Sequence, residues 1–254
     1  MMTCTFLGTG TSMGVPVAGG FGREHINGDP RNERFRCSAW IETDETSVVI
    51  DTSPEFRLQT IRSNIKTIDL VLITHEHMDH IAGLDDVRAY NYAQKSPIPL
   101  YTSRQAAESI ESRFDYMFGD DKYPGSTSVD IHVIEETETF RDLTITPLNY
   151  NHGMIDVQGY RINNFSYMTD VKSIPEETKE KVAGSDVLVL SGLRWDPPHP
   201  THLTIPEAVE IANELEIPQT YLIHMNSYVD HAKSNEKLPD HVQLAYDMME
   251  ISIP

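Results

Sequence analysis

Cysteine is scarce in this chain of 254 residues, which contains only Cys4 and Cys37. Two cysteines are too few for a disulfide scaffold or a thiolate metal cage on one chain, and they fit a reducing compartment. Long apolar runs are missing too, since no stretch approaches the roughly 18 apolar residues of a membrane span. The start, MMTCTFLGTGTSMGV, has neither a basic leader nor a long apolar segment. We therefore expect a cytoplasmic protein with no membrane partner.

Basic residues are also few. Twenty lysines and arginines stand against 39 aspartates and glutamates, which gives a net charge of −19. Such a charge repels polyanions, so we expect no long nucleic acid among the partners. A small anionic substrate remains compatible, because bound divalent cations would reverse the field locally.

The hydrophobic content of 39% is enough for a sizeable core, and no repeat or linker divides the sequence. We predict one domain over residues 1–254, of α+β class, with stacked sheets covered by helices. Short β-branched runs predict strands at Cys4–Leu7, Ser38–Glu42, Ser47–Ile50, Leu70–Ile73, Leu143–Thr146, Gly159–Ile162, Val187–Leu190 and Tyr221–Ile223. Helical patterns, three with a first-turn proline (Pro54, Pro175, Pro206), predict helices at Pro54–Ser63, Ser103–Phe114, Pro175–Ala183 and Ile205–Leu215.

Histidine, by contrast, is abundant, with 11 residues, and it clusters in the sequence THEHMDH. There His75, His77, Asp79 and His80 follow an apolar run directly. Histidine and aspartate are nitrogen and oxygen ligands for divalent ions, and crowding them is unfavourable unless a cation draws them together. The cluster therefore predicts a metal site with two ions.

Four ligands from one loop cannot complete two metal sites, so further ligands must come from elsewhere. His152, Asp170 and His224 each end an apolar, strand-like stretch. Strand ends present side chains at one rim of a sheet, which makes these three residues the expected remaining ligands.

The sequence THEHMDH-Ile-Ala-Gly-Leu, followed in order by His152, by Asp170 within YMTD and by His224, resembles the metallo-β-lactamase superfamily of metal-dependent hydrolases. The resemblance implies a four-layer αββα sandwich. It implies that His75, His77 and His152 hold one ion, that Asp79, His80 and His224 hold the other, and that Asp170 bridges both. Nitrogen and oxygen ligands favour zinc, with manganese or iron as alternatives.

The opening LGTGTSMGVP and the blocks IDTSPEFRLQ, GLDDVRAYNY and HPTHLTIPEA resemble the ribonuclease Z and phosphoribosyl cyclic phosphate phosphodiesterase branch of that superfamily. Close relatives in this branch pair as dimers. Members often carry a structural zinc held by cysteines after the GVP segment and by a histidine after the last catalytic histidine. Here those stretches read VAGGFGREH and His224-Met225-Asn226-Ser227, so we expect no third metal.

Outside the ligand set, the resemblance gives His202 a catalytic or phosphate-contacting role, with Asp79 orienting the attacking water. Asp51 is expected to support the metal loop from behind. Arg194 and Trp195 have two open readings, a phosphate-binding and stacking pair or an exposed pair without function. His25, His132, His231 and His241 lie in polar stretches, and we expect them to be exposed.

The residues and the resemblance together predict a dinuclear phosphodiesterase that acts on a small cyclic or nucleotide-like phosphate ester through a metal-bridging hydroxide. His202 is the expected proton donor. A transfer-RNA 3′ endonuclease and a lactone or thioester hydrolase are the enzymatic alternatives. A metal-dependent sensor of a phosphorylated metabolite is the alternative without catalysis.

Overall fold

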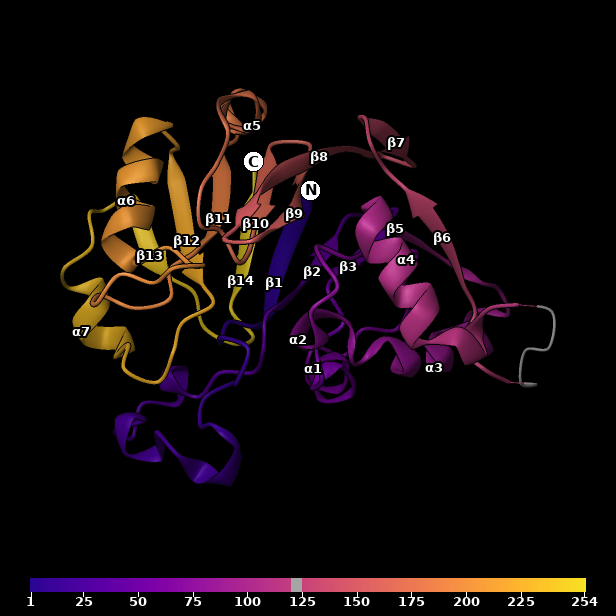
Figure 1. Cartoon of the computed structure of the whole chain (residues 1–254), viewed down its shortest axis with the longest axis horizontal. Helices are drawn as coiled ribbons and strands as arrows, with labels where there is room; N and C mark the ends of the chain where they lie inside the picture. Colours follow the sequence, from indigo (N-terminus) through magenta and orange to yellow (C-terminus); the bar gives the residue numbers. More distant parts are fainter. Residues whose placement is uncertain (120–124) are drawn as a thin grey trace.

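Two seven-stranded sheets form the centre of the molecule (Figure 1). The computed structural model describes residues 1–119 and 125–254. The first sheet has the order β14-β1-β2-β3-β4-β5-β6, and the second has the order β13-β12-β11-β10-β9-β8-β7. The strands of the first sheet are β1 (Met2–Gly8), β2 (Ser38–Glu42), β3 (Ser47–Ile50), β4 (Leu70–Leu72), β5 (Ile98–Thr102), β6 (Val129–Val133) and β14 (Glu250–Ile253). Those of the second are β7 (Glu138–Phe140), β8 (Leu143–His152), β9 (Ile155–Ile162), β10 (Phe165–Met168), β11 (Val187–Ser191), β12 (Gln219–Ile223) and β13 (Val242–Leu244).

Each sheet has an antiparallel half and a parallel half. Strands β3 to β6 run parallel in the first sheet, and strands β10 to β13 run parallel in the second. The remaining neighbours, from β14 to β3 and from β7 to β10, are antiparallel. Parallel strands place their carboxyl ends at one edge of a sheet, where ligand sites of such sheets form.

Helices cover the outer face of each sheet. They are α1 (Phe56–Arg62), α2 (Met78–Ile81), α3 (Arg88–Gln94), α4 (Arg104–Arg113), α5 (Glu176–Val182), α6 (Ile205–Glu214) and α7 (His231–Asn235). In Figure 1 the helices α1 to α4 flank the first sheet, and α6 and α7 lie outside the second. This arrangement confirms the expected α+β, four-layer αββα sandwich.

Three apolar cores hold the four layers together. The core between the sheets takes residues from both, among them Phe6, Ile41, Tyr160 and Tyr167. A second core joins the second sheet to its helices, and a third joins the first sheet to its own. Burial of each apolar side chain stabilises the fold by about 1.5–3 kcal/mol relative to exposure.

The sequence predicts most of the strands and helices that frame the site, with corrections at the prolines. Pro206 lies in the first turn of α6, as expected, and Thr204 caps this helix in a capping box with Glu207. Pro175 is instead the N-cap of α5, with extended backbone (ψ 152°), and Pro54 precedes the N-cap of α1. These two prolines therefore direct the chain into the helix without belonging to it.

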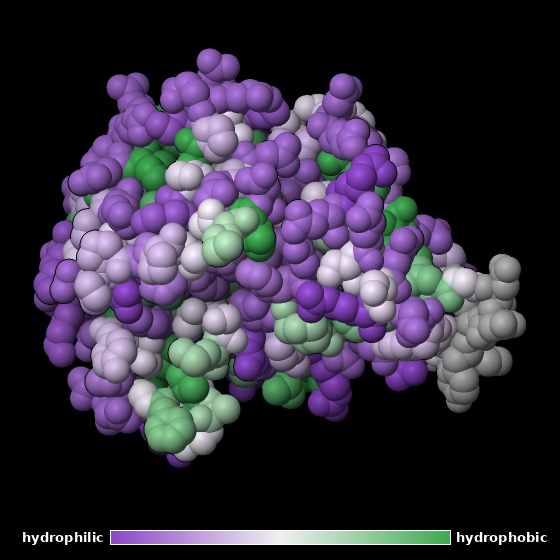
Figure 2. All heavy atoms as spheres, viewed as in Figure 1, coloured by the Kyte–Doolittle hydropathy of each residue, from purple (hydrophilic) through white to green (hydrophobic). Residues whose placement is uncertain are grey.

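The long segment between β1 and β2 is tied to the strand ends of the second sheet. Thr11 N donates to Met225 O at 3.0 Å, and Met225 N donates to Thr9 O at 3.1 Å. The indigo loop at the lower left of Figure 1 belongs to this segment, and Figure 2 shows pale and green atoms there on an otherwise mostly hydrophilic face. Among the described residues, no helix is long and apolar enough to cross a membrane.

Candidate metal centre

The THEHMDH cluster lies where β4 ends and the short helix α2 begins. His75 follows the strand by three residues, and His77 is the N-cap of α2. The first turn of the helix then carries Asp79 and His80. This change from extended to helical backbone directs the first two histidines to one position and the next two ligands to a neighbouring one.

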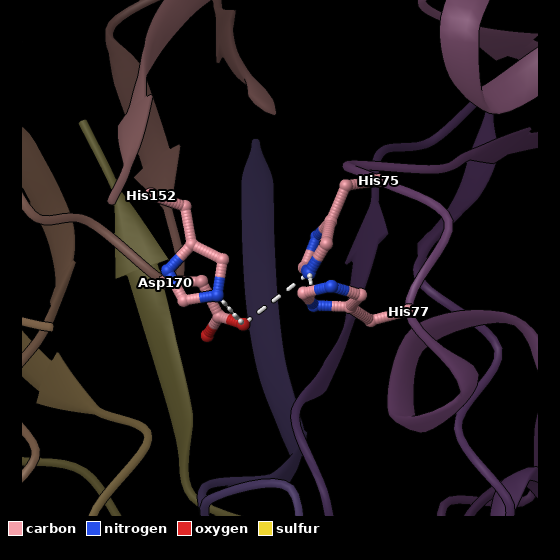
Figure 3. A group of neighbouring side chains, drawn as sticks. All are labelled: His75, His77, His152 and Asp170. Carbon is pink, nitrogen blue, oxygen red and sulfur yellow. Dashed lines mark hydrogen bonds and ion pairs between the residues drawn. The ribbon is translucent and has the colours of Figure 1, made fainter. Parts of the chain in front are cut away.

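His75, His77, His152 and Asp170 form a first group of donor atoms, which all lie within 4.8 Å of one another. His75 Nε2 is 3.0 Å from His77 Nδ1 and 3.3 Å from Asp170 Oδ2. His152 Nε2 lies 3.9 Å from the same Asp170 oxygen. Figure 3 shows the two motif histidines facing His152 and Asp170 from the opposite side.

Asp79, His80, Asp170 and His224 form the second group, also within 4.8 Å. His80 Nε2 lies 3.1 Å from Asp79 Oδ2 and 3.3 Å from Asp170 Oδ2. His224 Nε2 is 2.8 Å from Asp170 Oδ1. Asp170 is thus common to both groups, and its Oδ2 atom faces histidines of each.

The donor atoms fit divalent cations. The Nε2 atoms of His80 and His224 are buried and have no hydrogen-bond partner among the described residues, although carboxylate oxygens lie close to both. Bonds of 2.0–2.1 Å in a tetrahedral site place neighbouring ligand atoms roughly 3.3 Å apart, which is the range of most distances here. The nitrogen and oxygen atoms of each group therefore lie at the separations that the ligands of one cation have.

Asp51 holds the motif from behind, as expected from the sequence. Its fully buried carboxylate accepts hydrogen bonds from Thr74 N at 2.8 Å and from Thr74 Oγ1, and it lies 2.7 Å from His80 Nδ1. A carboxylate on Nδ1 leaves Nε2 of the same ring free to face a cation.

His152 is oriented by a contact that the sequence does not reveal. Its Nδ1 donates to the backbone carbonyl of Thr201 at 2.7 Å, which leaves Nε2 facing the first group. The cap of α6 is Thr204, three residues later, so Thr201 acts here through its carbonyl group. Thr74 is the second supporting residue found only in the structure, and its position at the end of the apolar run before His75 is the one signal that points to it.

Three residues of the site have left-handed backbone. The φ angles of Asp51, Asp170 and His224 are 60°, 57° and 64°. Aspartate and asparagine tolerate this region better than most residues, but a histidine there is uncommon. Each of the three follows closely after a strand, so the sharp turn directs its side chain across the edge of the sheet.

Burial and mutual charge shift the pKa values of the cluster strongly. Burial lowers the pKa of His75. Burial also opposes the charge of His224, but the Asp170 and Asp79 carboxylates raise its pKa to about 9. Burial disfavours the charge of Asp170, yet His224 and His80 hold the pKa of that carboxyl well below its usual range. Without cations, protons on histidine therefore balance the carboxylates, and a cation must displace them.

His202 lies beside both groups without belonging to either. Its ring centroid is 4.6 Å from that of His152 and 4.8 Å from that of His224, and its Nδ1 is buried without a partner among the described residues. Burial and the neighbouring His224 lower the pKa of His202 to about 3. The ring is therefore neutral at pH 7 in the metal-free protein.

Arg194 and Trp195 are not an exposed pair, because both side chains are partly buried. The Arg194 guanidinium donates to the carbonyls of Pro197 and Pro198 and so shapes the loop before His202. Trp195 is partly buried, and its Nε1 donates to Ser234 Oγ at 2.9 Å.

The four histidines expected at the surface differ in their exposure. The expectation is wrong for His231, which is only 4% exposed because its ring packs against Tyr246. His132 is exposed, and His25 and His241 are partly so.

Comparison with known proteins gives a consistent family. Residues 46–225 match a family model described as the beta-lactamase superfamily domain. Over 256 residues the chain is 35% identical to an octanoyltransferase of Porphyromonas gingivalis, a match that covers 99% of this chain and 52% of that protein. The chain spans about half the length of the curated relatives it matches. Their names therefore describe proteins with a large part outside the match.

Two solved structures have the same fold over essentially the whole chain. A diphosphatase from the PhnP family is 35% identical, with a TM-score of 0.91 and coverage of 100% of this chain and 98% of that one. The short form of human tRNase Z is 18% identical, with a TM-score of 0.74 and coverage of 99% of each chain. At that identity the second likeness concerns the fold alone.

Proposed function

We propose that this chain, which belongs to the metallo-β-lactamase superfamily of metal-dependent hydrolases, is a dinuclear phosphodiesterase for a small cyclic or nucleotide-like phosphate ester. The observation that carries the proposal is the pair of donor groups sharing Asp170. Two sites joined by one carboxylate suit two cations a few ångströms apart, an arrangement used for in-line displacement at phosphorus.

In this proposal His75, His77 and His152 would hold one cation, Asp79, His80 and His224 would hold the other, and Asp170, which belongs to both donor groups, would serve both. Zinc is our first choice, with manganese or iron as alternatives, because the donors are nitrogen and oxygen without thiolate. When bound, the two cations would lower the pKa of water toward about 7 and neutralise the charge of the phosphate ester. Asp79 belongs to the second donor group and is partly exposed, so its carboxylate would be placed to orient that water.

His202 completes the arrangement as the residue that meets the ester oxygens. Its Nδ1 is buried, so Nε2 is the atom that can reach a substrate. A neutral imidazole offers that N–H as a hydrogen-bond donor to a phosphoryl or leaving-group oxygen. Proton donation to the leaving alkoxide needs the imidazolium, and the negative charge of a bound ester raises the pKa of the ring in that direction.

Two observations favour a small phosphate ester, one over a carboxylic ester and the other over a long RNA. The structure that is 35% identical over the full chain is described as a diphosphatase, so diphosphate linkages of small nucleotide-like compounds belong among the test substrates. The net charge of −19 disfavours a long RNA, which would meet repulsion over most of the surface.

Hydrolysis of bis-p-nitrophenyl phosphate by purified, metal-loaded protein tests the proposal. We expect Asp79→Ala and His75→Ala to lower kcat by at least about 100-fold, because each removes a donor atom of one group. His132→Gln is the matched control, since His132 is half exposed and pairs with Glu138 away from the site. Equal turnover in wild type and Asp79→Ala would contradict the proposal. Cleavage of precursor transfer RNA or of a lactone alone, or tight binding without turnover, would replace it with another function.

The same assay separates the role of His202 from that of the donor groups. His202→Gln should lower kcat by about 100-fold or more, within the range usual for a positioned acid or hydrogen-bond donor. Metal content measured by mass spectrometry should stay that of the wild type, because His202 belongs to neither donor group. Loss of metal in proportion to the loss of rate would instead make His202 part of the cation site.

A further inference from the structure

A pocket of about 360 Å³ is lined in part by residues of loops that, elsewhere along their length, also carry His202 and His224. Three segments that are distant in sequence line it. His25 comes from the long segment after β1, and Trp195 comes from the loop that leads to His202. Tyr228 follows His224, and Lys233 and Lys237 come from α7 and the turn after it.

Two aromatic side chains of this pocket are held in place in different ways, Tyr228 at the surface and Trp195 against the core of the second sheet. The Tyr228 side chain is 75% exposed, and its ring centroid lies 4.9 Å from that of His25 at an angle of 56°. Trp195 is fixed by the hydrogen bond from its Nε1 to Ser234 Oγ. A largely exposed tyrosine supported by a second ring offers a flat surface on which another ring can stack.

Cationic groups lie next to these rings. The Lys237 ammonium is 5.3 Å from the centroid of the Trp195 ring, and it forms no ion pair with the residues that the structure describes. Lys233 pairs with Asp230 at 3.2 Å on the same wall. Glu24 also lines the pocket, next to His25. Of the two lysines, Lys237 is therefore the one available to an anionic ligand, and the rings beside it favour a flat one.

Chain connectivity keeps the pocket close to the donor groups. Tyr228 is four residues from His224, so their Cα atoms are at most about 14 Å apart. Asn226 N donates to Leu193 O at 3.0 Å, which joins the segment of Tyr228 to the start of the loop that carries Trp195. That loop returns to the donor groups at His202, so the pocket and the donor groups share two loops and lie within the length of a nucleotide.

We propose that this pocket binds the aromatic base of a nucleotide whose phosphoryl group lies at the two donor groups. The rings of Tyr228 and His25 stack on the base, Trp195 forms a wall, and Lys237 faces the anionic part of the ligand. This inference rests on the proposed function, because it places the substrate's organic part relative to the proposed reaction centre.

Tryptophan fluorescence provides a test that does not depend on turnover. The chain has two tryptophans, so Trp40→Phe leaves Trp195 as the single reporter. Adenosine 5′-monophosphate added to metal-loaded Trp40→Phe protein should quench this signal with a saturable curve. Ribose 5-phosphate, which lacks the base, should bind at least tenfold more weakly. Equal binding of the two compounds, or no quenching at all, would overturn the proposal.

The tyrosine variant gives a second readout. Stacking of a base on an aromatic ring contributes to the free energy of binding, so Tyr228→Ala should weaken adenosine 5′-monophosphate binding by about tenfold. Tyr92→Ala is the matched control, because Tyr92 is 66% exposed and lines none of this pocket. Unchanged affinity in Tyr228→Ala would also overturn the proposal.

Kinetics then distinguish failure of this inference from failure of the proposed function. With thymidine 5′-(p-nitrophenyl phosphate), Tyr228→Ala should raise KM and leave kcat unchanged. With methyl p-nitrophenyl phosphate, which carries no base, KM should stay the same. Nucleotide-dependent quenching without hydrolysis of either ester would leave the pocket assignment standing and remove the phosphodiesterase. Hydrolysis of both esters, with the same change of KM in Tyr228→Ala, would leave the phosphodiesterase standing and remove the pocket assignment.

Discussion

Asp170 is the residue on which both donor groups depend. Its two oxygens face His224 on one side and His75 and His80 on the other, at 2.8 to 3.3 Å. The left-handed backbone at this position turns the carboxylate across the sheet edge. A single side chain therefore fixes the separation of the two proposed cations.

Asp51 would act on the cations through His80, whose Nδ1 it contacts. Replacing it tests whether the contacts behind the donor groups contribute to cation binding. Asp51→Asn should lower divalent cation affinity by about 10- to 100-fold, because the amide no longer fixes the His80 ring with a negative charge. Competition with a chromophoric chelator measures this affinity.

Asp69→Asn is the control for that measurement. Asp69 also accepts a hydrogen bond from a strand backbone, Ser47 N at 2.9 Å, and it pairs with Arg141, but it belongs to neither donor group. A loss of affinity in Asp69→Asn equal to that in Asp51→Asn would show a general effect on folding and contradict the role given to Asp51.

At the scale of elements, the long segment between β1 and β2 is held by a buried guanidinium. Arg34 is only 2% exposed, and its terminal nitrogens donate to Asn32 Oδ1 at 3.2 Å and to Val229 O at 2.9 Å, with a longer contact to Asn226 O. Asn32 Oδ1 also accepts from His231 N at 2.8 Å. These bonds join the segment to the chain after His224, the two places where the resemblance puts the structural zinc ligands of related proteins.

Arg34→Met should therefore destabilise the protein by about 2–3 kcal/mol, because several buried carbonyl groups lose a charged donor. Urea unfolding of metal-loaded protein should show a lower midpoint with an unchanged slope. Arg57→Met is the control, because Arg57 is exposed at the surface. Arg36 is not suitable, since it pairs with Glu55. A midpoint equal to that of the wild type would show that the guanidinium does not anchor the segment.

Local patterns explain which elements the sequence reveals. Strands β2 and β3 have the predicted bounds because each is a short apolar segment, with Trp40 and Ile41 in β2 and a β-branched run in β3, that polar residues end. Strand β5 does not show in the pattern, since Pro97 and Pro99 argue against a strand, and it forms because it pairs in parallel with β4 and β6. Strand β13, with three residues, is too short to produce a period.

The residues of the site also fall into those that the sequence predicts and those that it does not. His75, His77, Asp79 and His80 can be predicted because their signal lies within six residues, and His152, Asp170 and His224 because each ends a strand-like stretch. The Thr201 carbonyl, the Arg34 contacts and the pocket beside Tyr228 cannot be predicted, because each depends on segments that meet only in the folded chain.

At the scale of the whole molecule, the donor groups join the two sheets. His75 to His80 follow β4 of the first sheet, whereas His152, Asp170 and His224 belong to or follow β8, β10 and β12 of the second. The site therefore exists only when the two sheets pack through their common core. Cations that bind only the folded chain stabilise this packing in proportion to the logarithm of their concentration over Kd.

Stoichiometric metal titration tests the central claim most directly. Protein freed of metal by a chelator is given increasing equivalents of Zn²⁺ or Mn²⁺, and hydrolysis of bis-p-nitrophenyl phosphate is measured at each step. The two donor groups predict no activity without metal and a plateau at two ions per chain, with no recovery in Asp79→Ala. Full activity in the metal-free protein, or a plateau at one ion per chain, would contradict a two-cation phosphodiesterase.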